Sequence, residues 1–193
     1  MPAHLILASS SKYRKEMLQR LRVDFDCISP SVDETPLNGE SALENCIRLA
    51  REKALAVSRL HPLAVVIGSD QVADVDGNAV SKPGNHENAK IQLKSMSGRT
   101  ITFQTAVCVT QLSSGKMIEF CTPTEVEFRD LSDDEIERYL RTEQPYDCAG
   151  SAKSEGLGIT LLKRIESKDP TALIGLPLIE TSQALRQLGI ILP

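Results

Sequence analysis

The chain has 193 residues, of which 41% are hydrophobic and 25% are charged, and its formal net charge is −4. That length supports one sizeable core, or two lobes that share one, without stabilising crosslinks. The five cysteines are an odd number, widely spaced and without a CxxC or Cys/His pattern, so we expect buried thiols in a reducing compartment rather than disulfides or zinc ligands. The acidic balance argues against general attraction to nucleic acid or anionic lipid, although a local basic pocket would be unaffected.

The chain opens without a charged and then apolar leader, and its longest apolar runs, such as LAVVIG at 63–68, fall well short of the ~20 residues of a membrane helix. We therefore expect a cytoplasmic protein that binds no membrane. Because we find neither an internal repeat nor a low-complexity linker, residues 1–193 are expected to form a single domain.

In the first half, apolar β-prone runs alternate with helical patterns, which is typical of an α/β protein. We expect strands at 5–8, 25–29 and 63–70, and a hairpin over 72–80 that turns at Asp76-Gly77. Helices are expected over 9–21, from the Ser41 capping box to Pro62, and between Asn85 and Gly98. The apolar stripe of the long middle helix is expected to contain Leu43, Ile47, Ala50, Ala54 and Val57.

In the second half, residues 100–112 and 116–129 predict a long antiparallel pair joined by SSG, in which Pro123 indicates an edge position or a bulge. Ser132 and Glu135 form a second capping box, before a helix over 133–141. Three glycines punctuate the loop CAGSAKSEGLG at 148–158, and a last helix is expected over 177–189.

The stretch LASSSKYR at 7–14 lies at the junction between the first strand and the first helix. Backbone N–H groups at a helix start attract anions, and three hydroxyls with Arg14 one turn later would complete a phosphate cradle. The alternative is that one of the serines simply caps the helix.

Other polar residues lie beside apolar elements. Asp70 ends a buried strand, where open α/β sheets place ligand-binding groups, while Lys53 borders an apolar helix stripe and Lys82 follows the hairpin. Each has an ordinary alternative, because a lysine can extend its amine to solvent and an aspartate can cap a turn. The adjacent acids Asp33 and Glu34 could likewise be solvated loop residues.

Six segments, LASSSKYR, VDET, REKA, IGSDQV, SKP and CAGSAKSEG, resemble in order and spacing the motifs of the Maf family of nucleotide pyrophosphatases. The resemblance covers essentially the whole chain. It implies an elongated mixed sheet flanked by helices, with two lobes and a central cleft, similar to that of inosine triphosphatase. It also implies a homodimer that hydrolyses a nucleoside triphosphate to the monophosphate and pyrophosphate with a divalent metal, Mg²⁺ or Mn²⁺.

By this resemblance Asp70 is the general base that activates the attacking water. Glu34 and Asp70 would hold the metal, because Mg²⁺ usually takes one or two carboxylates together with phosphate oxygens. An aspartate beside cations stays ionised, so the metal is expected to help acidify the water. The groups that offset or bind the triphosphate are expected to be Ser9, Arg14, Lys53 and Lys82.

Tyr13, Gln71 and Glu155 match the positions that separate Maf branches. The pyrimidine branch typically has arginine at the position of Tyr13 and threonine at that of Gln71, so this chain looks like the branch that acts on 7-methyl-GTP. Methylation at N7 makes the guanine ring cationic, which favours a stacked aromatic face and a nearby carboxylate. That branch is expected to have tryptophan at the aromatic position, and tyrosine offers a smaller stacking face.

Three other hypotheses remain open at this point. The first is a Maf pyrophosphatase for dTTP, UTP or another modified nucleotide, and the second is a non-catalytic nucleotide sensor linked to cell division. The third is a module that binds methylated RNA caps, but the acidic balance and the absence of an RNP-like motif count against it. We expect a small nucleotide, and no nucleic acid, as the binding partner.

Overall fold

The computed structural model describes residues 4–192. The strands are β1 (Leu5–Ala8), β2 (Asp26–Cys27), β3 (Val65–Val75), β4 (Asn78–Val80), β5 (Thr100–Gln111), β6 (Lys116–Phe128) and β7 (Leu162–Ser167). The helices are α1 (Lys12–Gln19), α2 (Ala42–Ser58), α3 (His86–Met96), α4 (Asp133–Glu143) and α5 (Leu178–Gln187). Shorter 3₁₀ turns lie at Leu112–Ser114, Ala149–Ser151, Leu157–Leu161 and Ala172–Ile174.

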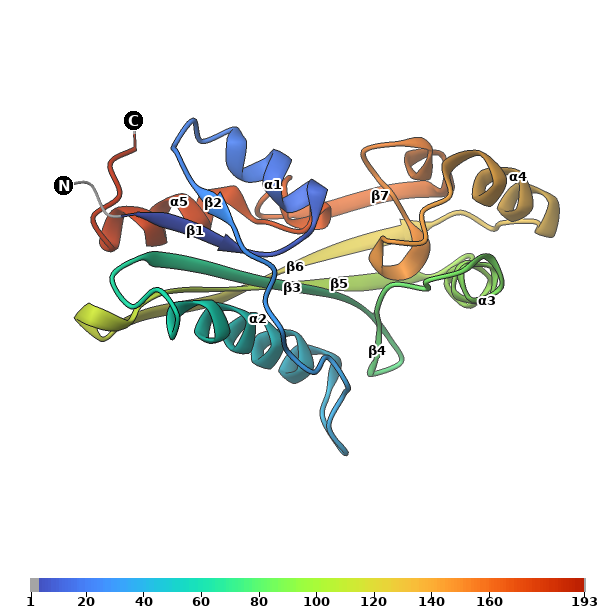
Figure 1. Cartoon of the computed structure of the whole chain (residues 1–193). Coiled ribbons are helices and arrows are strands. Elements are labelled where there is room, and N and C mark those ends of the chain that lie inside the picture. The colour runs from blue at the N-terminus through green and yellow to red at the C-terminus, as the bar shows by residue number, and fades with distance from the viewer. Residues whose placement is uncertain (1–3, 193) are drawn as a thin grey trace.

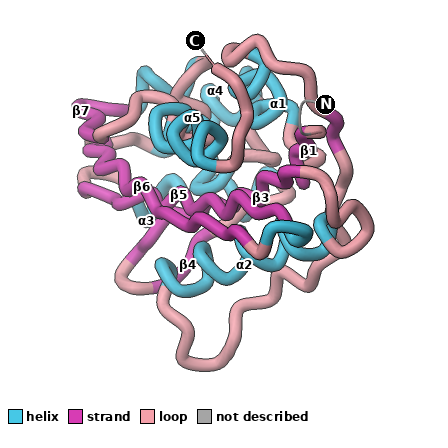
Figure 2. The backbone as a smooth tube through the Cα atoms, turned by 90° about the vertical axis from the view of Figure 1, so that its left-hand side faces the viewer, coloured by secondary structure: helices cyan, strands magenta, loops and turns pink. Residues whose placement is uncertain are grey.

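The strands join one sheet in the order β2-β1-β3-β5-β6-β7, with β4 paired to β3 beside this path. β1 is parallel to β2 and β3, whereas the other pairs are antiparallel. Figure 1 shows β3, β5 and β6 along the length of an elongated molecule. α2 covers one face of the sheet, and α1 and α5 cover the other (Figure 2). This arrangement confirms the predicted fold class, a mixed sheet flanked by helices.

Two hydrophobic cores lie toward opposite ends of the long strands. The core under α1 and α5 includes Leu18, Ile67 and Leu185. The core under α3 and α4 includes Leu93, Phe103 and Leu140. Both draw side chains from β3 and β5, so these strands connect the two lobes. Over residues 4–192, the structure contains no helix whose length and apolar character would let it cross a membrane.

Several short-range predictions are confirmed. Ser41 and Ser132 each form a complete capping box, with Glu44 and Glu135 respectively. Asp76 and Gly77 both have positive φ, 56° and 83°, as a tight two-residue hairpin turn requires. Pro123 lies at an edge, because pairing of β6 with β7 begins only at Thr124. The bulge in this pair lies farther along, at Glu127 and Phe128.

The predicted apolar stripe of α2 was wrong at its first position, because Leu43 is 41% exposed. Ala42 and Cys46 face the sheet instead, and their small side chains let the helix lie close to it. The predicted strand over 25–29 shortens to Asp26–Cys27, and Cys27 is exposed rather than buried. β7 had no counterpart in the prediction, because its burial is low and its sequence lacks an alternating apolar pattern.

Candidate active site

Three adjoining cavities share Arg14 and Lys82 and so form one cleft. The widest, about 260 Å³, is lined by Glu34, Lys53 and Asp70. The second, about 140 Å³, lies against the serine turn that precedes α1. The third, about 50 Å³, lies between Tyr13 and the loop that carries Glu155. All nine predicted site residues line this cleft: Ser9, Tyr13, Arg14, Glu34, Lys53, Asp70, Gln71, Lys82 and Glu155.

The serine turn combines a helix cap with a polar cavity wall. The Ser11 hydroxyl accepts a hydrogen bond from the Arg14 backbone N–H and is the N-cap of α1, so the capping alternative is correct for this serine. Ser9 is buried, and its hydroxyl accepts from the Ser11 N–H at 3.1 Å. Both residues also line the second cavity, so capping and anion binding do not exclude each other here.

Lys53 lines the widest cavity and contacts two carboxylates there. Its Nζ is 2.6 Å from Asp70 Oδ1 and 2.7 Å from Glu34 Oε1. The side chains of Lys53 and Asp70 are only 7% and 9% exposed, whereas that of Glu34 is 58% exposed. Burial opposes ionisation of Glu34, but the hydrogen bond to Lys53 and the charges of Lys82 and Arg14 outweigh it and lower the pKa of this carboxyl. Glu34 is therefore held ionised among the three basic side chains of the cleft.

Gly68 of β3 brings Lys53 and Asp70 together. A Cβ at this position would lie 2.3 Å from the Ala50 carbonyl oxygen and 2.5 Å from the Ala54 backbone nitrogen. Only glycine allows α2 to approach β3 this closely. The contact places Lys53, one residue before Ala54, within reach of the carboxylate two residues after Gly68.

Arg14 and Gln71 are both tied to the segment 172–175. Arg14 Nε donates to the Gly175 carbonyl at 3.0 Å, and Arg14 lines all three cavities of the cleft. Gln71 Nε2 donates to Thr105 Oγ1 and to the carbonyls of Ala172 and Leu173. Within residues 4–192 the Gln71 amide oxygen has no hydrogen-bond partner, so it remains an acceptor in the cleft.

The third cavity brings an aromatic ring and two carboxylates together. Tyr13 Oη donates to Asp147 Oδ1 at 3.2 Å, and the Lys12 ammonium lies 4.8 Å from the Tyr13 ring centroid. Glu155 is exposed as a residue, but it lines the cavity, and loss of water around its carboxyl raises the pKa of Glu155. Asp147 was not among the predicted residues, although it directly precedes the CAGSAKSEG motif.

Residues 4–188 match the family described as Maf-like protein. The chain belongs to this family. It is 56% identical over 188 residues to the 7-methyl-GTP pyrophosphatase of Polaromonas sp., covering 97% of this chain and 86% of the relative. It is 55% identical over 182 residues to the protein of the same name from Ralstonia nicotianae, covering 94% of each chain. The Staphylococcus aureus Ham1 protein shares the fold over 66% of this chain and 72% of its own, with a TM-score of 0.50 and 18% identity.

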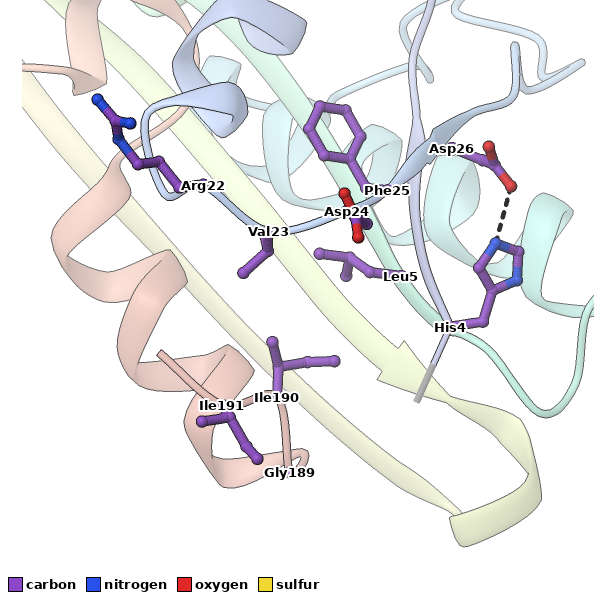
Figure 3. A pocket seen from close by; sticks show the side chains of 10 residues that line it. All are labelled: His4, Leu5, Arg22, Val23, Asp24, Phe25, Asp26, Gly189, Ile190 and Ile191. Atoms are coloured by element: carbon purple, nitrogen blue, oxygen red, sulfur yellow. Dashed lines mark hydrogen bonds and ion pairs between the residues drawn. The ribbon is translucent and has the colours of Figure 1, made fainter. Parts of the chain in front are cut away.

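A larger cavity of this Maf-like protein lies elsewhere. It has a volume of about 630 Å³, and none of its lining residues lines the cleft. Figure 3 shows Leu5, Val23 and Ile190 along its apolar wall, with the His4 ring hydrogen-bonded to Asp26 at its edge. Volume alone would therefore select a region to which no predicted site residue belongs.

Proposed function

We propose that this Maf-like protein hydrolyses 7-methyl-GTP to 7-methyl-GMP and pyrophosphate. The observation that carries the proposal is the division of one cleft into two chemically different ends. Cations and carboxylates gather around Lys53, whereas the Tyr13 ring and the Glu155 carboxyl line the other end, with Arg14 and Lys82 common to both. The names of the relatives, 7-methyl-GTP pyrophosphatase, support the same activity.

The Lys53 end suits a triphosphate. A triphosphate carries about four negative charges, and Arg14, Lys53 and Lys82 supply positive charge with fixed or flexible N–H donors. The Ser9 and Ser11 turn adds hydroxyls and the start of α1. These groups would bind the phosphates and stabilise the charge that develops on the leaving pyrophosphate.

Asp70 is the proposed general base. A water oxygen would attack the α-phosphorus while its proton passes to the carboxylate, and the bond from this phosphorus to the bridging oxygen would break, releasing pyrophosphate. Lys53 contacts Asp70 Oδ1, and Oδ2 has no hydrogen-bond partner within residues 4–192, so it is the oxygen available to the proton. The Lys53 contact also fixes the orientation of the carboxylate.

A divalent cation fits this end of the cleft. Within residues 4–192 no group of three or more His, Cys, Asp or Glu side chains could enclose a metal alone. Glu34 and Asp70 nevertheless converge on Lys53 Nζ, and Mg²⁺ commonly takes one or two carboxylates while phosphates and waters complete its shell. When bound by these two residues, Mg²⁺ or Mn²⁺ would neutralise phosphate charge and lower the pKa of the attacking water.

The Tyr13 end suits a cationic base. An aromatic face attracts a cation, and the Glu155 carboxyl adds negative charge in a partly desolvated position. The free amide oxygen of Gln71 can accept a hydrogen bond from an N–H donor on the base edge. Together these groups would favour 7-methyl-GTP over GTP, because only the methylated base carries the extra positive charge.

The test is a panel of nucleoside triphosphates assayed for pyrophosphate release with Mg²⁺ and with Mn²⁺. We expect 7-methyl-GTP to have the highest kcat/KM, with GTP, UTP and dTTP below it. A preference for UTP or dTTP would contradict the substrate assignment, and absence of release from any nucleotide would favour the sensor hypothesis. The proposal also includes the cytoplasmic homodimer that the family resemblance implies, and light scattering of the purified protein measures its oligomeric state.

A further inference from the structure

Asp147 contacts the first turn of α1 with both oxygens of its carboxylate. Oδ1 accepts a hydrogen bond from Tyr13 Oη at 3.2 Å, across 134 positions of sequence. Oδ2 lies 3.3 Å from Lys12 Nζ. Because Asp147 lines the same cavity as Tyr13 and Glu155, these contacts are made within the proposed base site.

The charge states favour this hydrogen bond. Burial is the main cause that raises the pKa of Tyr13, so its hydroxyl keeps its proton and donates. Burial opposes ionisation of Asp147, but the Lys12 ammonium and the Tyr13 hydroxyl outweigh it and lower the pKa of this carboxyl. Near neutral pH a phenol therefore donates to a carboxylate, and a charge-assisted hydrogen bond is stronger than one between neutral groups.

Holding the hydroxyl limits the rotation of the aromatic ring. Tyr13 is the second residue of a helix of eight residues, and its side chain lies at the cavity. Anchoring Oη removes much of the freedom about its two side-chain torsions. A ring that is ordered in advance loses less entropy when it stacks on a ligand, so its stacking contributes more to binding.

We propose that Asp147 is a positioning residue for base selectivity, which acts by holding the Tyr13 ring in the plane that stacks on the methylated base. This inference rests on the proposed function, since it concerns how the same site distinguishes 7-methyl-GTP from GTP. The contacts of its two oxygens with α1 give Asp147 a route to the base through Tyr13, and the Asp147→Asn variant distinguishes this route from direct action of the carboxylate on the base.

The experiment compares the ratio of kcat/KM for 7-methyl-GTP to that for GTP in the full-length wild type, Asp147→Ala, Asp147→Asn, Tyr13→Phe and the double variant Tyr13→Phe/Asp147→Ala. Asp147→Ala and Tyr13→Phe should each narrow the ratio by about three- to tenfold, the factor typical of a partly exposed cation–π contact. The double variant should narrow it no further than either single variant. Asp147→Asn keeps an oxygen that accepts from Tyr13 and should retain most of the wild-type ratio.

Two kinetic results would overturn the proposal. One is that the effects of the two single substitutions multiply in the double variant. The other is an Asp147→Asn ratio as narrow as that of Asp147→Ala, which would indicate that the charge acts directly on the base.

A carbon-13 NMR measurement tests the contact without substrate. The chain has three tyrosines, and Asp147→Ala should move the Tyr13 ring resonance, which Tyr13→Phe identifies by its loss. An unmoved Tyr13 resonance would refute the contact, whereas a wild type without preference for 7-methyl-GTP would refute the proposed function instead.

Discussion

The cavity beside His4 has a volume of about 630 Å³, whereas the widest part of the cleft has about 260 Å³. The hydrogen-bonded pair at the larger cavity, His4 with Asp26, has side chains that are 56% and 69% exposed. Lys53 and Asp70 in the cleft are 7% and 9% exposed. An exposed pair costs little to form and contributes little, whereas burying a charge carries an effective desolvation cost of several kcal/mol per ion. Buried charge, rather than enclosed volume, therefore distinguishes the candidate site.

The largest expected effect comes from removing the buried carboxylate. Asp70→Asn should lower kcat by about 10²- to 10⁴-fold, the range expected for loss of a general base, while the fold and much of the substrate binding remain. Pyrophosphate release and circular dichroism measure the two properties. Near-normal turnover would show that Asp70 is not the general base. Buried charge would then no longer distinguish the cleft from the larger cavity.

The next largest loss of activity is expected from removing the phosphate-binding cations. Replacing Arg14, Lys53 or Lys82 by alanine should each weaken transition-state stabilisation by about 2 to 4 kcal/mol, as for loss of one oriented donor at a reacting phosphate. Lys82→Ala is the most informative of the three, because this side chain is exposed and its loss should leave the thermal midpoint unchanged. Wild-type kcat/KM in all three variants would place the phosphate site outside this cleft.

Substitutions in the base site should have smaller effects than those at the phosphate-binding cations. Tyr13→Leu and Glu155→Gln should each narrow the preference for 7-methyl-GTP over GTP. The expected factor for Tyr13→Leu is about five- to thirtyfold, because leucine fills space without an aromatic face.

The contribution of Glu155 to this preference should depend on pH. Desolvation raises the pKa of Glu155 above its ordinary value, so lowering the pH protonates this carboxyl earlier and should narrow the wild-type preference. In Glu155→Gln that pH dependence should disappear, and a ratio unchanged in both variants would disprove this account of specificity.

The smallest effect is expected at the larger cavity. Asp26→Asn removes the exposed partner of His4 and should lower the free energy of unfolding by less than about 1 kcal/mol, with kcat/KM unchanged. Urea unfolding and the pyrophosphate assay provide the comparison with Asp70→Asn. A loss of activity comparable to that of Asp70→Asn would show that this cavity takes part in the reaction.

The features that the sequence by itself determined are those whose groups lie within a few residues of one another. Ser41 caps α2 with Glu44, and Asp76-Gly77 turns the hairpin, because the hydrogen bonds and positive φ angles involved are local. The motif segments also identified the family, since their residue types and spacing need no tertiary contact to be read.

The tertiary structure alone decided how those residues combine. Lys53 reaches Asp70 only because Gly68 lets α2 lie against β3, and Tyr13 meets Asp147 across 134 positions because the loop after α4 returns to α1. The exposed Leu43 and the unpredicted β7 have the same origin. Their environments depend on which surface a neighbouring element covers, and this is set by sheet order and by packing between segments distant in the sequence.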